Sequence, residues 1–397
     1  MKKKLLSVGL VITIIITLTG CSSAGSYDKA GKKYFSDGNY EAAATSFSDA
    51  ISANPNRADY YIDYGMALIE LGKEEEAITQ FDHVYMDKDI ILINKNNKRA
   101  LRGKGIAYYS SQKYEEAITQ FEAAAQINQL KELDEDILTY MADTYIKLGN
   151  NDKAIETYTL IISENQKNAS ALIRRAVCYK NTGDYEKSLA DYDAVIALEP
   201  ANYDYYFGKY YLMSENDDES GAAAVLLQLA AIAAKTEEDK YNVAKLHFLQ
   251  GDYETALTEF DKAYSNGIVE ANFYVGEIYR ENKDYTKAVY YYELFIKDSD
   301  AVSPAVYNQM AYCLIKMEKY TEALEYLEKG IKQNQAGFLQ ILMKNEIIAY
   351  EKLGKLKEAN KKLGEYLALY SGDGQTIREA EFLETRLIKP VIEEAVK

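Results

Sequence analysis

The stretch that decides the fold is residues 27–55, which read YDKAGKKYFSDGNYEAAATSFSDAISANP. Two segments with helical periodicity lie on either side of Gly38-Asn39, and Pro55 closes the unit. Small and large residues recur at fixed places in both segments: Gly31, Ala43 and Ala50 are small, and Tyr27, Tyr34, Tyr40 and Phe47 are large. One such pair of helices cannot bury its apolar side alone, so it needs neighbours of the same kind.

The rest of the chain supplies those neighbours. The same pattern of small and large residues recurs about ten times over residues 27–373, with a spacing of 32 to 40 residues. The pentapeptide AITQF stands verbatim at residues 77–81 and again at 117–121. Gly-Asn, Gly-Lys or Gly-Asp marks many of the turns, because glycine just after a helix tolerates a positive φ. We therefore expect an all-α chain built from tandem two-helix units.

Three segments depart from this regularity. The sixth unit, residues 203–236, has a tyrosine-rich first helix, an acidic loop at 216–219 and an alanine-rich second helix. It is either a diverged copy or a hinge that divides 27–202 from 237–373. Six extra residues within 86–97 include the apolar run IILI at 90–93. They indicate either a longer second helix that packs on its neighbour or an exposed apolar patch for a partner.

The third departure is the C-terminal segment, residues 374–397. It follows Asp373-Gly374 and carries an apolar stripe with charged residues opposite: Ile377, Ala380, Leu383, Leu387 and Ile388. Stacked repeats need an end helix with a polar outer side to remain soluble. The stripe therefore predicts a capping helix over 374–397.

The period and the positions of the small and large residues resemble the tetratricopeptide repeat, over roughly residues 27–373. The resemblance implies a right-handed α-solenoid of about ten helical hairpins plus the C-terminal capping helix. Repeats 1–5 would occupy 27–202, the degenerate repeat 6 would occupy 203–236, and repeats 7–10 would occupy 237–373. Tryptophan, which is common at the fourth position in the family, is absent from this chain.

The first twenty residues have the features of an export signal. A basic head, MKKK, precedes an apolar run from Leu5 to Leu18, which is shorter than the roughly 20 residues of a membrane span. The sequence LTGC at 18–21 resembles the bacterial lipoprotein box, which implies that Cys21 receives acyl chains such as palmitate. An uncleaved anchor and simple secretion are the alternatives. We expect a tether over 21–26 and a location on the extracytoplasmic side of the cell membrane.

The charge of the chain narrows the class of partner. The formal net charge is −16, and removal of the first twenty residues, with three lysines and no acid, leaves −19. Such a surface repels nucleic acid and anionic lipid headgroups. We therefore predict no nucleic-acid partner, and we expect membrane attachment through the lipid rather than through charge.

The sequence lacks the motifs of an enzyme or a metal site. It contains two histidines, of which His247 takes a position that is packed in most units, and His83 lies five units away. No phosphate-binding loop, nucleophile elbow or HExxH motif is present. We read the acidic clusters 134–136 and 216–219 as solvated loop charge, and Cys178 and Cys313 as packed thiols. We expect no cofactor and no catalysis.

The remaining candidate for a site is the concave groove that the resemblance implies. In the family, the first helices line this groove, and the matching positions here are mostly apolar with scattered charge. They suit a protein or an extended peptide, although the same residues could simply complete the packing. The predicted groove residues are Ile62, Met66, Ile69, Arg102, Ile106, Tyr109, Ile173, Val177, Tyr241, Phe248, Phe273, Arg280, Tyr312 and Ile315.

We therefore predict a membrane-anchored scaffold for protein–protein interaction at the cell envelope. The alternative is a docking subunit or assembly factor of one envelope or secretion complex. A hydrolase or sugar-binding protein is disfavoured, because it needs convergent polar groups that the sequence does not offer.

Overall fold

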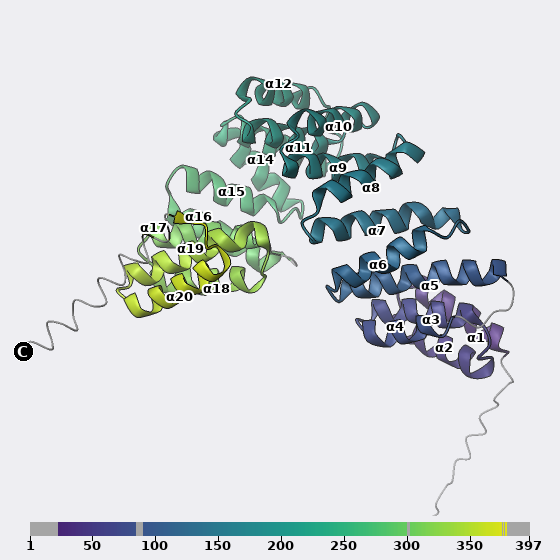
Figure 1. Ribbon diagram of the computed structural model, residues 1–397. Coiled ribbons are helices and arrows are strands. Elements are labelled where there is room, and N and C mark those ends of the chain that lie inside the picture. The colour runs from purple at the N-terminus through teal and green to yellow at the C-terminus, as the bar shows by residue number, and fades with distance from the viewer. Residues whose placement is uncertain (1–22, 85–89, 300–301, 375, 377, 379–397) are drawn as a thin grey trace, which may run out of the picture. The chain divides into compact units, whose positions relative to one another are not determined.

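The structure is a computed structural model, and it describes residues 23–84, 90–299, 302–374, 376 and 378 (Figure 1). These residues form twenty α-helices and one short 3₁₀ helix, and they contain no strand. The predicted all-α fold is thereby confirmed. The chain divides into two compact units between Asp217 and Asp218, within the loop of the sixth repeat.

The first unit consists of five helical hairpins and one further helix. Within a hairpin the first and second helices pack on each other, and each hairpin packs on the next in chain order (Figure 1). The pairs are α1 (Ala24–Ser36) with α2 (Tyr40–Ala53), α3 (Ala58–Glu70) with α4 (Glu74–Asp82), α5 (Ile90–Ser110) with α6 (Tyr114–Ala125), α7 (Asp134–Lys147) with α8 (Asn151–Glu164), and α9 (Ala169–Thr182) with α10 (Tyr185–Leu198). The 3₁₀ helix η1 (Lys131–Leu133) precedes α7, and α11 (Tyr203–Glu215) packs on α10.

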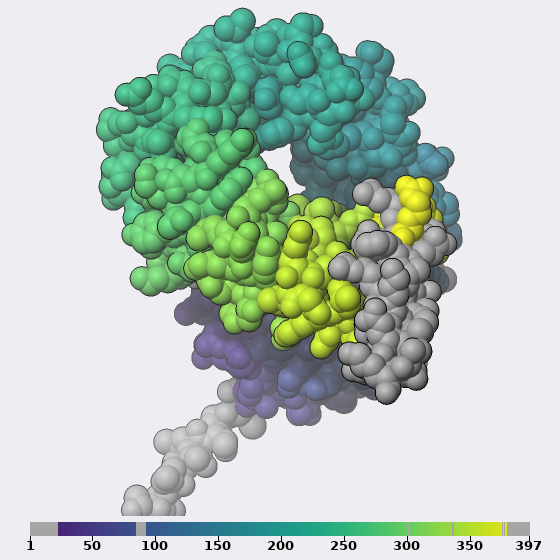
Figure 2. All heavy atoms as spheres, turned by 90° about the vertical axis from the view of Figure 1, so that its left-hand side faces the viewer, coloured from purple at the N-terminus to yellow at the C-terminus, as the bar shows by residue number. Residues whose placement is uncertain are grey.

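The second unit begins with α12 (Glu219–Ala230) and continues with four hairpins. They are α13 (Glu237–Leu249) with α14 (Tyr253–Ser265), α15 (Ala271–Glu281) with α16 (Tyr285–Asp298), α17 (Pro304–Lys316) with α18 (Tyr320–Lys332), and α19 (Ala336–Lys352) with α20 (Leu356–Leu369). In the space-filling view these helices follow one another in chain order, from green to yellow (Figure 2). Both units are therefore stacks of the predicted two-helix element.

The seam inside the hairpins is built as the sequence predicts, from a small residue opposite a large one, which is an aromatic ring in most hairpins and Leu327 in α17–α18. Phe121 and Tyr292 are fully buried. A Cβ atom added to Gly105 would lie 2.4 Å from the ring of Phe121, and one added to Gly276 would lie 2.6 Å from the ring of Tyr292. Only glycine allows these rings to approach the neighbouring helix so closely. The same seam occurs in both units.

The turns inside the hairpins require a left-handed backbone, as the turn glycines predict. Gly149, for example, has a φ of 73°. The same place in other hairpins is taken by residues with a side chain, such as Gln112 with a φ of 59° and Lys283 with a φ of 60°. The left-handed region disfavours a side chain, so these two turns are less stable than those with glycine.

Two sequence-based boundaries change in the structure. The extra residues before the third repeat do not lengthen a second helix, because α4 ends at Asp82. They extend the following first helix instead, so that α5 starts at Ile90 and runs for 21 residues. No glycine or proline interrupts residues 90–102, so the helix continues towards its N-terminus. At the start of the chain, α1 begins at Ala24, so half of the predicted tether is helical.

Some predictions fall on residues that the structure does not describe. These are the export signal and Cys21, the side chains of the apolar run 90–92, and most of the capping helix. Residues 374, 376 and 378 of that predicted helix are helical. Within the described ranges, no helix combines the length and the apolarity that crossing a membrane requires.

Candidate protein-binding face

The first helices of successive hairpins lie side by side and present a common surface in each unit (Figure 1). We call this surface the first-helix face. In the first unit it comprises α1, α3, α5, α7, α9 and α11, and in the second unit it comprises α13, α15, α17 and α19. All fourteen predicted groove residues lie on these helices.

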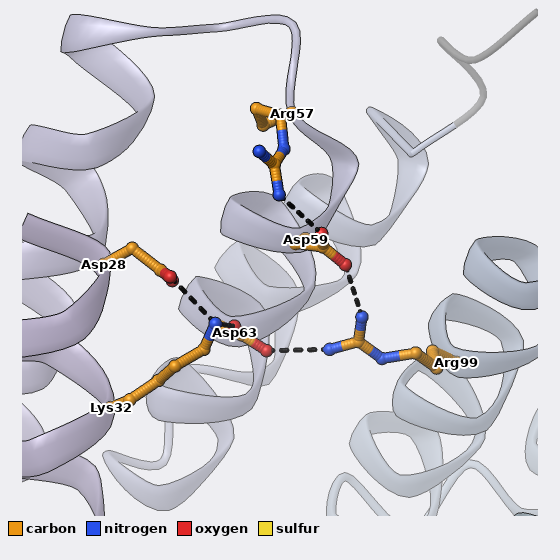
Figure 3. Close-up of polar contacts among 6 residues, drawn as sticks. All are labelled: Asp28, Lys32, Arg57, Asp59, Asp63 and Arg99. Carbon is orange, nitrogen blue, oxygen red and sulfur yellow. Dashed lines mark hydrogen bonds and ion pairs between the residues drawn. The ribbon is translucent and has the colours of Figure 1, made fainter. Parts of the chain in front are cut away.

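In the first unit, oppositely charged side chains connect each first helix to the next. On α3, Asp59 and Asp63 both accept hydrogen bonds from Arg99 of α5, at 2.6 Å and 2.9 Å (Figure 3). Burial works against the charged form of Asp59, but its bonds from Arg57 and Arg99 outweigh burial and place its pKa below the ordinary value. At Asp63 burial dominates and raises the pKa in spite of Arg99.

Helix α3 also contacts α1 through an ion pair. Lys32 of α1 donates to Asp28, one turn earlier, at 2.8 Å, and its ammonium lies 3.3 Å from Asp63 (Figure 3). Arg57, which directly precedes α3, donates to Asp59 at 3.1 Å. Three carboxylates and three cations thus share one network at the N-terminal end of the first unit (Figure 3).

Further ion pairs continue in the same way along the first unit. Arg102 of α5 donates to Asp136 of α7. Arg174 of α9 donates to Asp143 of α7, at 2.7 Å from Oδ2. Lys180 of α9 lies 2.6 Å from Glu215 of α11. We call this series, from Lys32–Asp63 to Lys180–Glu215, the ion-pair ladder.

A buried lysine adds to the contact between α5 and α7. The side chain of Lys98 is fully buried, and it donates to the backbone oxygen of Ile127 at 2.9 Å and to the carboxylate of Asp134. The acidic cluster 134–136 therefore does not lie in a loop, as the sequence suggested, although Asp134 and Asp136 remain 42% and 40% exposed. It forms the first turn of α7, where Asp134 and Asp136 bind cations of α5.

The second unit joins its first helices through rings and amides instead. Between α13 and α15, the rings of Tyr241 and Phe248 lie 6.0 Å and 5.6 Å from that of Tyr274. The ammonium of Lys245 lies 5.5 Å from the centre of the Tyr241 ring and 6.0 Å from that of Tyr274. Such contacts depend on the electron-rich ring faces and not on a paired acid.

Side-chain amides connect the next two pairs of first helices, α15 with α17 and α17 with α19. Gln309 of α17 donates to both oxygens of Glu277 on α15, at 3.3 Å and 3.2 Å. Glu277 also accepts from Arg280 of its own helix and from the hydroxyl of Tyr292. Between α17 and α19, Asn345 donates to Asn308 at 2.8 Å. Charge pairing between helices is thus replaced by neutral donors on this face.

The predicted groove residues divide into four groups by exposure and contact. Ile62, Ile106 and Tyr241 are buried, so they offer little surface. Arg102 and Arg280 are held by carboxylates. Val177 is the most accessible, with 39% of its surface exposed. The others are half-buried apolar residues that pack against the cores: Met66, Ile69, Tyr109, Ile173, Phe248, Phe273, Tyr312 and Ile315.

The sequence did not single out several polar residues of the face, among them Asp59, Asp63, Asp143, Lys245 and Glu277. One of these contacts, between Asp59 and Arg99, could have been predicted from the sequence. Asp59 and Arg99 lie 40 residues apart, the spacing of their two repeats, and carry opposite charge. Opposite charges at matching positions of consecutive repeats predict a contact between their first helices.

A small cavity opens on this face at its N-terminal end. It has a volume of about 180 Å³ and is lined by Lys32, Phe35, Phe47, Asp63 and Met66. A larger hollow of about 490 Å³ lies elsewhere in the first unit, at the open end of the fourth hairpin. Its lining includes Leu160 of α8, a second helix, which is 54% exposed.

The thiols and imidazoles have no shared site. Cys178 and Cys313 are fully buried, as predicted, and burial raises their pKa values to about 11 and about 12. His247 is not a packed core residue: its side chain is 27% exposed, and its Nδ1 lies 2.7 Å from a carboxylate oxygen of Glu259. His83 stacks on Tyr61. Among the described residues, no three His, Cys, Asp or Glu side chains are placed to hold a metal ion.

Comparison with protein families identifies one kind of repeat along the chain. Models described as tetratricopeptide repeat match residues 29–89, 108–176, 169–202, 241–304 and 304–336, together well over half of the chain. Tetratricopeptide repeat protein 34 of Xenopus laevis is 23% identical over 223 residues. The match covers 53% of this chain and 37% of that protein, so the chain spans little more than a third of that relative.

Several solved structures have a similar fold. A tetratricopeptide repeat protein from Parabacteroides merdae is 20% identical, with 62% of this chain and 93% of that chain covered and a TM-score of 0.42. YrrB, described as having an unusual peptide-binding site, is 20% identical, with 54% and 97% covered and a TM-score of 0.40. Yeast Tom70 is 13% identical, with 94% and 98% covered and a TM-score of 0.45.

Proposed function

Because this chain belongs to the tetratricopeptide repeat family, we propose that it is a membrane-anchored scaffold that holds a protein or peptide on its first-helix face. Stacks of this kind are suited to protein–protein interaction, since side by side helices offer an extended surface. The mechanism is contact and shape complementarity, without turnover of a substrate.

The observation that carries the proposal is the accessible apolar surface on the first helices. Val177 on α9 is 39% exposed although hairpins pack on both sides of it. Phe248 and Tyr312 are half-buried on the same face of the second unit. Apolar side chains that remain accessible within a packed stack are typical anchoring points for a partner's helix or extended segment.

The polar groups of the face are consistent with a peptide ligand. In the first unit the ladder already pairs Arg99 and Lys32 with acids, so a charged ligand of these cations would have to compete with Asp59 or Asp63. In the second unit, Lys245 and Lys316 lie over tyrosine rings, and Lys316 is 5.2 Å from the ring centre of Tyr312. Ammonium groups above rings leave a surface that accepts apolar side chains and peptide carbonyl groups together.

The location in the cell is part of the proposal. The basic head, the short apolar run and LTGC at 18–21 support export and acylation of Cys21. Two acyl chains provide a stable anchor where one would be marginal. The partner is then an envelope protein, either one of several clients or a single complex for which this chain is a docking or assembly factor.

The test compares two accessible apolar residues of the first unit. Val177→Glu places a charge on the first-helix face, and Leu160→Glu places one on the second-helix side, in the larger hollow. Both chains are crosslinked in intact cells, and the recovered proteins are identified by mass spectrometry. We expect Val177→Glu to lose the partners and Leu160→Glu to keep them. The reverse result would move the site to the hollow beside α8.

The same experiment separates the two forms of the proposal. Recovery of one partner in a fixed ratio indicates a docking or assembly factor, whereas recovery of many partners in small amounts indicates a general scaffold. Cys21→Ser tests the anchor: the variant should leave the membrane fraction. Retention in that fraction would count against acylation.

A further inference from the structure

The first described helix, α1, has a face that no other described helix covers. Helix α1 packs on α2 and touches α3. Its packed side is marked by Gly31, where an added Cβ would lie 2.6 Å from the ring of Phe47. Ser26, Lys29, Lys33 and Ser36 follow one another at three- and four-residue spacing on the opposite side, and all four are exposed. We call these four residues the outer stripe of α1.

The outer stripe is positively charged, in contrast to the chain as a whole. Lys29 and Lys33 form no ion pair with another described residue. The carboxylate of α1, Asp28, is turned away and accepts from Lys32 on the side of α3 (Figure 3). With three lysines and one aspartate, α1 carries a charge of +2 in a chain whose net charge is −16. The next carboxylate, Asp37, lies beyond the end of the helix.

An amphipathic ring flanks the stripe. Tyr34 follows Lys33 and is 41% exposed, the largest exposed apolar surface of α1. Tyrosine is enriched where lipid headgroups meet water, because its ring is apolar and its hydroxyl group is polar. Lysines next to such a ring are the chemistry that binds an anionic phospholipid surface.

The distance from the acylated cysteine to this helix is short. Two residues, Ser22 and Ser23, lie between Cys21 and Ala24, where α1 begins, so the linker spans at most about 10 Å. The helix itself is 13 residues long, or about 20 Å. A helix so close to the acyl chains can either lie along the membrane, with its whole outer stripe on the headgroups, or stand upright, with Ser36 far from them.

We propose that the outer stripe of α1 lies flat on anionic phospholipid headgroups and so fixes the orientation of the first hairpin at the membrane. This rests on the lipid anchor of the proposed function. The lysines attract the anionic surface, and the acidic remainder of the chain is repelled by it. Both forces favour the same arrangement, in which α1 is at the membrane and the later hairpins of the first unit are directed away from it.

The experiment reads the distance of Ser36 from the membrane. Ser36→Cys is labelled with a fluorophore in the acylated full chain, where buried Cys178 and Cys313 do not react because burial raises their thiol pKa values. The protein is placed in vesicles of phosphatidylcholine and phosphatidylglycerol that contain a headgroup-labelled quencher lipid. We expect strong quenching at Ser36→Cys and none at Glu186→Cys, an exposed position on α10, four hairpins further along the same unit.

Two matched double variants test the role of charge. Lys29→Gln with Lys33→Gln should lower the ratio of docked to undocked helix by about 25-fold, because each lysine near an anionic surface contributes roughly fivefold. Lys357→Gln with Lys361→Gln, measured with the Ser36→Cys label, removes two exposed lysines at the same spacing on α20 and should change nothing. Unsubstituted α1 on vesicles of phosphatidylcholine alone should show the same loss of docking as the Lys29 and Lys33 double variant.

The outcomes separate this inference from the anchor on which it rests. A chain that floats with the vesicles but is not quenched at Ser36 overturns the flat arrangement and leaves the anchor intact. Quenching that is unchanged in the Lys29 and Lys33 double variant overturns recognition by the lysines. A chain that does not float with the vesicles overturns the anchor itself, and the inference with it.

Discussion

The first helices of the two units lie side by side in the same way but touch through different chemistry. In the first unit, the ladder joins α1 to α11 by pairs such as Arg99–Asp63 and Lys180–Glu215. In the second unit, rings join α13 to α15, and amide donors join α15 to α17 and α17 to α19. Seams with a small residue opposite a buried ring occur in both units. The seam therefore determines the fold, and the first-helix face is left free to differ.

This difference has energetic consequences. Charge pairs near a surface weaken as salt screens them, whereas ring contacts and amide bonds do not. A buried charge also makes its partner indispensable, since an unpaired buried ion costs several kcal/mol. We therefore expect the contacts between first helices to weaken more with salt in the first unit than in the second.

The largest effect should be common to the two units and come from the seam. Phe121→Ala in the first unit and Phe260→Ala in the second each remove a fully buried ring. We expect each to lower the free energy of unfolding of its unit by about 3–5 kcal/mol. Hydrogen exchange of the surrounding helices in the full chain measures this. A loss confined to one unit would break the claim that the seams are equivalent.

The next effect should occur in the first unit alone. Asp134→Ala leaves the fully buried Lys98 without its carboxylate, and Asp134 itself is 42% exposed. We expect a loss of about 3 kcal/mol, at the low end of the range for a broken buried pair. Faster hydrogen exchange in α5 and α7 would report it.

Lys98→Met is the control for this loss, because it removes the buried charge and keeps an apolar chain of similar length. It should be nearly neutral, since apolar replacements of buried ions often are. Equal losses in Asp134→Ala and Lys98→Met would mean that packing, and not charge, holds α5 to α7.

Salt should lower the stability of the first unit more than that of the second, with a smaller effect than the substitutions above. Each unit holds one buried thiol among its described residues, Cys178 in the first and Cys313 in the second, and both react only when the helices open. At about 1 M salt, where the screening length is about 3 Å, we expect labelling of Cys178 to speed up several-fold and that of Cys313 to change little. Mass spectrometry of the labelled peptides gives both rates from one sample. Equal acceleration would show that the ladder does not stabilise the first unit.

The smallest effect should come from the turns, and it should again be the same in both units. Gln112→Gly and Lys283→Gly relieve a side chain at a positive φ, with values of 59° and 60°. Each should stabilise its hairpin by about 1 kcal/mol. Gly149→Ala, at a φ of 73°, is the opposite change and should cost a similar amount. Denaturant midpoints measure these shifts, and stabilisation by Gly149→Ala would contradict the assigned backbone.

Much of the fold could be predicted from the sequence because it depends on local and periodic features. The glycine at each turn marks a left-handed residue, and the spacing of small and large residues marks the seam. The unit that departs most from the pattern, residues 203–236, still forms two helices, α11 and α12. The extra residues before the third repeat lengthen α5 and not the preceding helix, which the sequence did not predict because periodicity alone does not say which of two neighbouring helices an insertion lengthens.

The candidate site could be predicted less well from the sequence. The helices that carry the face could be named, but Ile62 and Ile106 proved to be buried, since exposure depends on how far each hairpin is rotated against the next. The sequence predicts unpaired loop charge at 134–136, because nothing in the local sequence indicates that Lys98, some 36 residues earlier, is buried beside it.

The sequence by itself determined the two-helix unit, its repetition and the position of its turns, because glycine conformation and side-chain size act within a few residues. Only the tertiary structure decided which of the 46 basic and 62 acidic groups meet across hairpins. These charge-pair contacts depend on the rotation of one hairpin against the next, to which every residue of the seam contributes. The ladder in the first unit and the rings in the second are therefore properties of the assembled stack.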